Sequence, residues 1–84
     1  MRYPDYEFEE HLSRAALVED FSGTDALEFA GHKIAVSLID RDAFLPERFG
    51  YGAWLYWMES FDNEQRETLR QKLVALRVEA RLKG

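Results

Sequence analysis

The sequence predicts a small single domain of the α+β class: a helix, a β-hairpin, a third strand and a last helix, with an antiparallel sheet and both helices packed on one of its faces. Three observations predict this class. Apolar residues recur at helical spacing in the last quarter of the chain, they alternate on both sides of a glycine in the middle, and 84 residues is the length of one domain. The chain has no internal repeat and no linker, so residues 1–84 are expected to share one core.

The first helix is predicted over residues 4–21. Pro4 suits the first helical turn, because its missing N–H group would have no helical partner there. One apolar face follows at helical spacing, made of Phe8, Leu12, Ala15, Ala16 and Val18. Leu17 and Phe21 lie off this face, so the end of the helix is expected to be covered from a second side. A short strand around Tyr6 and Phe8 is an alternative for the beginning of this segment, because these two residues also alternate.

Residues 25–39 are predicted to form a β-hairpin. Gly31 and His32 are the two central residues of its turn, because a type II′ turn requires glycine at the first central position. This turn sets Leu27 opposite Val36. One face of the hairpin then collects the apolar side chains that alternate along both strands: Leu27, Phe29, Ile34, Val36 and Leu38.

Seven of the chain's twelve aromatic residues lie between positions 44 and 61. Large rings bury roughly 150–250 Å² each, so this segment either organises the core or presents a surface to a partner. Residues 51–58 fit both a strand and a buried helix, since nearly all of them are large and apolar. The aromatic content and the glycines Gly50 and Gly52 favour a third strand.

The last helix is predicted over residues 63–82. Asp62 and Gln65, three positions apart, resemble the capping box that begins many helices. The side expected to pack on the sheet carries Leu69, Leu73, Leu76 and Ala80. The opposite side carries a second apolar stripe: Val74, Val78 and Leu82. Either the first helix covers this stripe within the same chain, or a second subunit or a target protein does.

The chain is acidic, with a net charge of −5, and eight of its sixteen acidic residues lie in the first 28 positions. An acidic protein is weakly attracted to the phosphate backbone of nucleic acids, and its charge favours a basic protein partner or simply solubility. The chain contains no cysteine. No stretch reaches the ~18 apolar residues of a membrane span, and the N-terminal residues lack the pattern of a secretory signal. We therefore expect a cytoplasmic protein without a membrane contact.

Two groups of residues are predicted to bind a protein partner. The first group is aromatic and consists of Tyr51, Trp54, Tyr56 and Trp57. The second is the stripe of Val74, Val78 and Leu82 on the last helix. In a strand, successive side chains point to opposite faces, so the aromatic residues cannot all enter the core. We expect at least one of Trp54, Tyr56 and Trp57 to be partly exposed in the monomer and buried on association.

Four arginines line up between the two apolar sides of the last helix: Arg66, Arg70, Arg77 and Arg81. This row is an alternative binding surface, because arginines on one line can contact successive phosphates while nearby aromatic rings stack on bases. The other interpretation is intramolecular pairing with the acidic first helix. A third hypothesis reverses the roles: the carboxylates of the first helix imitate the phosphates of DNA.

No residue pattern indicates catalysis or a cofactor. His11 and His32 have no second histidine four residues away, and the serines lack the context of an activated nucleophile. Asp40, Arg41 and Asp42 follow the hairpin and are typical of a polar exit from a sheet. We predict no catalytic, cofactor-binding or metal-binding residue.

Size, acidic charge, the lack of cysteine and the aromatic content together make the chain similar in type to proteins that act by occlusion. Immunity proteins of nuclease toxins and phage-encoded inhibitors of host defence, including anti-CRISPR proteins, are of this type. The similarity rests on no motif and assigns no residue a role. The sequence therefore predicts a non-enzymatic protein that binds and inhibits a protein partner and that can act as a homodimer. The alternative is a nucleic-acid-associated accessory protein that uses the arginine row.

Overall fold

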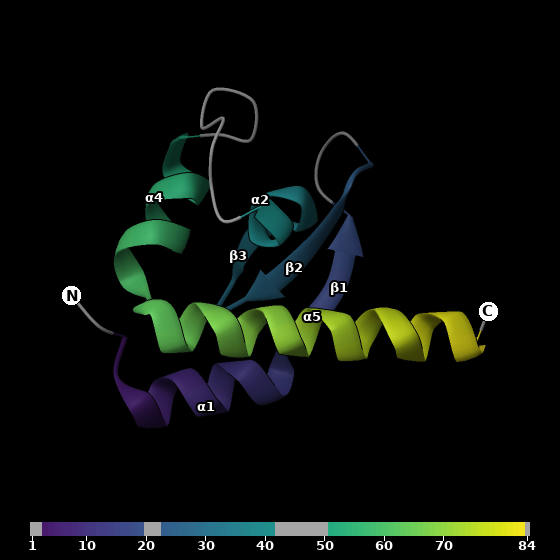
Figure 1. Cartoon of the computed structure of the whole chain (residues 1–84), viewed down its shortest axis with the longest axis horizontal. Coiled ribbons are helices and arrows are strands. Elements are labelled where there is room, and N and C mark those ends of the chain that lie inside the picture. Colours follow the sequence, from purple (N-terminus) through teal and green to yellow (C-terminus); the bar gives the residue numbers. More distant parts are fainter. Residues whose placement is uncertain (1–2, 20–22, 42–50, 84) are drawn as a thin grey trace.

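A computed structural model describes residues 3–19, 23–41 and 51–83, together with the side chains in these ranges except those of residues 41, 51, 53 and 54 (Figure 1). The elements follow in the order α1 (Asp5–Arg14), β1 (Ala16–Glu19), β2 (Asp25–Phe29), β3 (His32–Ala35), α2 (Val36–Arg41), α4 (Tyr51–Ser60) and α5 (Asn63–Lys83). The three strands form an antiparallel sheet in the order β1-β2-β3, and helices pack against it. The predicted α+β class is confirmed.

The core lies between the sheet and the layer of α1 and α5. Leu27 in the central strand stands opposite Leu17 of β1 and Ile34 of β3, so one face of the sheet is apolar across all three strands. Rings from α1, β2 and the connection between α4 and α5 meet on this face: the centroids of Phe8, Phe29 and Phe61 are 5.3–5.9 Å apart. Leu69 and Leu73 of α5 belong to the same buried cluster.

The prediction of one helix over residues 4–21 is wrong, because α1 ends at Arg14 and residues 16–19 form strand β1. Ala15 already has an extended backbone, with φ −61° and ψ 141°. Leu17, the residue that lies off the helical face, gains a place opposite Leu27 when the chain is extended. A two-stranded hairpin alone is marginally stable, and β1 supplies the third strand.

The hairpin is confirmed for residues 25–35, with corrections to its turn and its end. Ala30 and Gly31 are the central residues of the turn, and both have positive φ, +51° and +83°. Positive φ at both positions is the requirement of a type I′ turn rather than the expected type II′. Leu27 therefore stands opposite Ile34 and not opposite Val36.

The predicted second strand ends four residues early, and residues 36–41 form helix α2 instead. The side chains of Val36 and Leu38, which were expected on the hairpin face, are buried from this helix, together with Ile39. An apolar run of this length fits either structure, because periodicity alone cannot separate a short buried strand from a buried helical turn.

The third strand predicted over residues 51–58 is wrong, since this segment is helix α4. Trp57 and Phe61 lie four residues apart and are both buried, which is the spacing of one helical side. Aromatic residues are common in strands, but a helix can bury large aromatic side chains equally well when they recur along one of its sides. Gly52 is exposed in the first turn, where an added Cβ would contact nothing within 4 Å.

The last helix is confirmed, with one more residue than predicted. Its capping box is formed: Oδ1 of Asp62 accepts a hydrogen bond from the backbone N–H of Gln65 at 2.8 Å, and Oε1 of Gln65 accepts one from the N–H of Asp62 at 3.4 Å. Leu73 is buried, as expected, and Leu76 is half-buried against the core. Gln65 also reaches the N-terminal segment, because its Nε2 donates to the carbonyl oxygen of Tyr3 at 2.8 Å.

Candidate protein-interaction face

Helix α5 carries an exposed apolar stripe along the side that faces away from the sheet. Its members are Val74, Val78 and Leu82, which are 56%, 47% and 83% exposed. We call these three residues the α5 stripe. Among the described residues, the other large apolar side chain that is exposed is Tyr6 on α1. The predicted second stripe is therefore uncovered in the isolated chain.

Over the first half of α5, the other three sides of the helix have partners within the chain. Leu69 and Leu73 pack into the core, and Arg77 forms an ion pair with Asp40 at the end of α2 at 3.3 Å. On the remaining side, α1 lies along the first half of α5 (Figure 1). The alternative that the first helix covers the α5 stripe is wrong, because α1 flanks α5 instead of crossing that stripe.

The last two turns of α5 project beyond the elements that hold its first half. Figure 1 shows α5 continuing well past the end of α1. Ala80 lies on the side of the helix that carries Leu69 and Leu73, yet its side chain is exposed. Arg81 and Lys83 are exposed as well. This end of the helix is therefore accessible on all sides and combines apolar and basic side chains.

A groove of about 270 Å³ runs between α1 and the first half of α5. Phe8 and Leu12 of α1 contribute apolar atoms to it. Three carboxylates line it as well, from Asp5, Glu9 and Glu64. The groove is therefore lined mostly by polar and acidic groups around a smaller apolar surface from Phe8 and Leu12, and its negative charge is opposite to the positive charge at the end of α5.

The predicted aromatic surface divides between the core and its edge. Trp57 has no exposed surface and contacts the guanidinium group of Arg70, which lies 5.8 Å from the ring centroid. The expectation that Trp57 contacts a partner fails for the isolated chain, because the ring belongs to the core. The side chains of Tyr51 and Trp54 lie outside the described part of the structure.

Tyr56 is half-buried, in agreement with the expectation that at least one of the three aromatic residues named above is partly exposed. Its ring stacks on the imidazole of His32 at a centroid distance of 3.9 Å. Burial raises the pKa of the Tyr56 phenol, and a hydrogen bond with Tyr3 acts in the same direction. These contacts hold Tyr56 against the hairpin.

The arginine row has partners within the chain, although not the partners predicted. Nη1 of Arg66 donates to the carbonyl oxygens of Met58 at 3.0 Å and Phe61 at 2.9 Å, and Nη2 donates to Oδ1 of Asn63. Arg66 thus satisfies carbonyl groups at the end of α4, which have no helical partners of their own. The expected pairing with the acidic first helix is wrong for this residue.

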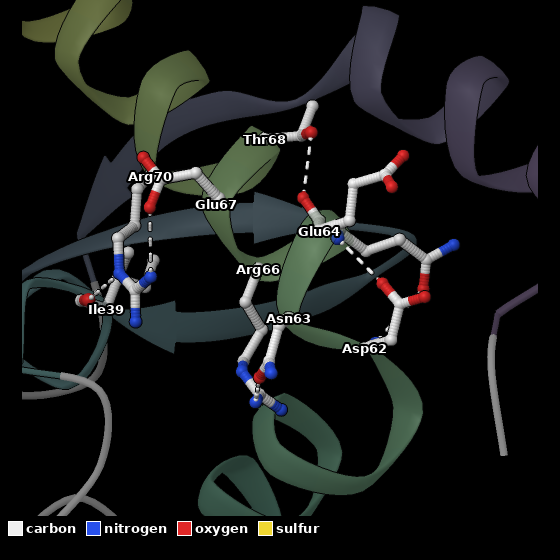
Figure 2. Close-up of polar contacts among 9 residues, drawn as sticks. Ile39, Asp62, Asn63, Glu64, Arg66, Glu67, Thr68 and Arg70 are labelled. Carbon is white, nitrogen blue, oxygen red and sulfur yellow. Dashed lines mark hydrogen bonds and ion pairs between the residues drawn. The ribbon is translucent and has the colours of Figure 1, made fainter.

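Arg70 and Arg77 bind the end of α2. Nε of Arg70 donates to the carbonyl oxygen of Ile39 at 3.1 Å, and its Nη1 pairs with Glu67 at 3.3 Å; Figure 2 shows the side chain reaching both groups. Arg81 is exposed. Sequence reasoning missed this role because it did not foresee α2, whose carbonyl groups attract the guanidinium groups.

The residues considered for catalysis have structural surroundings. His11 packs against the rings of Tyr3 and Phe29, with centroids 6.1 and 5.7 Å away, and Asp40 pairs with Arg77. Asp42 lies outside the described residues. Within the described ranges, no three His, Cys, Asp or Glu side chains are grouped so that they could hold a metal ion.

The described helices include none that combines the length and the apolar character needed to cross a bilayer. No protein-family model, curated protein or solved structure matches this chain.

Proposed function

We propose that this chain is a non-enzymatic, cytoplasmic protein-binding module that uses the outer face of α5 to bind a protein partner and inhibits that partner by occlusion. The observation that supports the proposal is the α5 stripe, three exposed aliphatic side chains in line on a helix whose first half packs against the rest of the chain on its other sides. Exposed apolar residues scattered singly are ordinary, whereas a contiguous row is typical of interaction sites.

The geometry of the stripe favours a helix-in-groove mode of binding. Val74, Val78 and Leu82 follow one another at intervals of four residues, which is the spacing of anchor residues on a helix that docks into an apolar groove. Arg81 and Lys83 flank the apolar row with exposed charge, which favours the correct orientation of a partner. A partner seated here would lose access to its own apolar groove, and this is the physical basis of inhibition by occlusion.

Nucleic-acid binding through the arginine row is less well supported. Three of the four guanidinium groups, those of Arg66, Arg70 and Arg77, already bind carbonyl or carboxylate oxygens of the chain. Phosphate contacts would have to replace these hydrogen bonds. The net negative charge of the chain also repels the phosphate backbone of a nucleic acid. We therefore keep the protein partner as the proposal.

The test compares two charge insertions on the same helix. Val78→Glu places a carboxylate in the α5 stripe, whereas Ala80→Glu places one on the opposite side, at a position that is also exposed. We expect the immobilised wild type and Ala80→Glu to retain the same protein from an extract of the source organism, and Val78→Glu to lose it. The purified captured protein should be inhibited by wild type and Ala80→Glu only.

Equal retention and equal inhibition by Val78→Glu would contradict the proposal. Retention on immobilised DNA or RNA across a salt series is the second measurement. Strong retention that falls steeply with salt would instead favour the nucleic-acid alternative, because the release of counterions from phosphates makes such binding strongly salt-dependent.

A further inference from the structure

We propose that, in the free protein, a second copy of this chain covers the α5 stripe in a two-fold dimer, with Leu82 of each copy seated in the groove between α1 and α5 of the other. The inference rests on the proposed function, because it concerns regulation of the same face: a protein partner then has to displace the second copy. Three observations carry it, namely the groove, the charge of the helix end and the spacing between them.

The groove and the helix end are complementary in chemistry. Leu82 is the most exposed large apolar side chain among the described residues, at 83%. The groove offers apolar atoms from Phe8 and Leu12 within a volume of about 270 Å³. A leucine that moves from water into such a site is stabilised in proportion to the apolar area it buries.

The charges on the two features are opposite in sign. Asp5, Glu9 and Glu64 line the groove, while Arg81 and Lys83 stand on either side of Leu82 in the sequence. All five of these side chains belong to residues with exposed surface. Of these two cations, Lys83 lies on the groove side of Leu82, so docking of the helix end brings its ammonium group toward the groove carboxylates, whereas Arg81 points to the opposite flank of the α5 stripe.

The spacing along α5 allows both copies to dock at once. Thr68 lines the groove, and Leu82 lies 14 residues further along the same helix. Fourteen residues make almost four helical turns, so the two positions lie on nearly one line about 21 Å apart. An antiparallel pair of α5 helices with its two-fold axis near Ala75, midway between them, sets each Leu82 level with Thr68 of the second copy. The small side chain of Ala75 lets the helices approach closely.

The same two-fold arrangement places the remaining residues of the face in matching positions. Val74 and Val78 lie near the axis in both copies and cover each other. Glu67 and Arg81 are also 14 residues apart, and both point to the same flank of the α5 stripe. Each Arg81 then stands within about one turn of Glu67 of the second copy. Glu67 is accessible for this contact, with 58% of its side chain exposed beside Arg70.

The area that a stable interface must bury favours a two-fold dimer, because a contact made by the α5 stripe alone is too small. A stable interface buries about 800 Å² on each partner, which three aliphatic side chains do not supply. In a two-fold dimer every contact occurs twice, so the stripe, the groove and the exposed side of α1 all contribute on both copies. Figure 1 shows α1 beside the half of α5 on which the second copy's helix end would rest.

The experiment uses charge reversal at Glu67 and Arg81, with sedimentation equilibrium over a concentration series as the measurement. We expect the wild type to dimerise. Arg81→Glu alone and Glu67→Arg alone should each weaken the dimer roughly tenfold or more, because like charges then face each other twice. An equimolar mixture of the two variants should restore the wild-type affinity, because every facing pair in the mixed dimer is again of opposite sign.

Leu82→Asp tests the groove, and Ala80→Glu is the control. We expect Leu82→Asp to abolish the dimer and Ala80→Glu to leave it intact, with unchanged circular dichroism in both. A wild type that remains monomeric up to ~1 mM would overturn the inference, since such a dimer has negligible affinity. So would a mixture of the two charge variants that associates no better than either alone.

These outcomes are separate from those of the proposed function. A monomeric wild type whose captured protein is still lost on Val78→Glu would remove the dimer and leave the protein-binding face in place. A wild type that dimerises as described while Val78→Glu captures and inhibits like the wild type would support the dimer and contradict the inhibitory function.

Discussion

Arg70 joins the first half of α5 to the end of α2, because its Nε donates a hydrogen bond to the carbonyl oxygen of Ile39 at 3.1 Å. The same guanidinium group lies 5.8 Å from the centroid of the buried Trp57 ring. One side chain therefore connects α5, α2 and α4. Such a contact is structural, although the residue belongs to a row that resembles a phosphate-binding surface.

Replacement of Arg70 should accordingly reduce stability. We expect Arg70→Ala to lower the free energy of unfolding by about 1–3 kcal/mol, because the Ile39 carbonyl loses a charged donor and Trp57 loses a covering group. Urea denaturation measures the change. Arg81→Ala, at an exposed position of the same helix, is the matched control; at a protein concentration low enough to keep the chain monomeric, it should stay within about 0.5 kcal/mol of the wild type. Equal effects of the two variants would contradict this role of Arg70.

A substitution at Ala30 should stabilise the turn between β2 and β3. This residue has φ +51°, a left-handed conformation that disfavours residues other than glycine, asparagine and aspartate. Ala30→Asn creates the Asn-Gly pair preferred in type I′ turns and should raise the free energy of unfolding by about 0.5–1 kcal/mol. Gly31→Val should lower it, because a β-branched residue is strained at φ +83°. Thermal melts of the two variants should therefore shift in opposite directions.

Shortening a side chain to alanine should lower the free energy of unfolding on the buried side of α5 but not on its exposed side. Leu73 is 1% exposed, so Leu73→Ala should cost about 2–5 kcal/mol through lost burial and the cavity that remains. Val74, the next residue, is 56% exposed, and Val74→Ala should be close to neutral for the monomer. Denaturation should be followed at low protein concentration, so that any self-association does not contribute. A Leu73→Ala variant that unfolds like the wild type would refute the placement of this face.

Stability should fall at alkaline pH because of Tyr56. Burial raises the pKa of this phenol above its ordinary value of 10.0, so the folded chain keeps the proton that the unfolded chain releases. The contribution is complete below pH 10 and is lost as the pH rises above this value. Unfolding free energies measured between pH 8 and about 11 should decline more steeply for the wild type than for Tyr56→Phe. Parallel curves would show that Tyr56 does not carry the effect.

The sequence predicted those elements whose signals are local. The start of α5 has a capping box, and its apolar residues repeat over many turns, so both the helix and the α5 stripe could be located from the residues alone. Gly31 likewise predicted a turn. The type of turn and the strand register were predicted wrongly, because Ala30 is a central residue of the turn although alanine disfavours positive φ. Local sequence signals therefore predicted the positions of the last helix and of the turn more reliably than the pairing of residues between strands.

The remaining errors come from contacts between distant segments. Ala16 and Val18 continue the apolar face predicted for a helix, yet both residues pair with β2 in a strand. Residues 51–60 contain enough aromatic side chains for either structure, and burial of Trp57 against Phe61 and Arg70 stabilises the helix. The partners of Arg66 and Arg70 are carbonyl groups at the ends of helices that the sequence analysis had not predicted. The α5 stripe could be predicted because it depends only on the spacing of apolar residues along one helix, and not on contacts with distant segments.

The hydrogen bond from Gln65 to the carbonyl oxygen of Tyr3 joins positions 62 residues apart. During synthesis, α1 cannot reach this partner until most of the chain has left the ribosome, whereas the three neighbouring strands can pair earlier. Contacts of long sequence separation are slow to form because the loop between them must close first. We therefore expect the meander β1-β2-β3 to assemble before α1 docks on α5. The same order predicts that the backbone amides of α1 exchange with solvent sooner than those of β2.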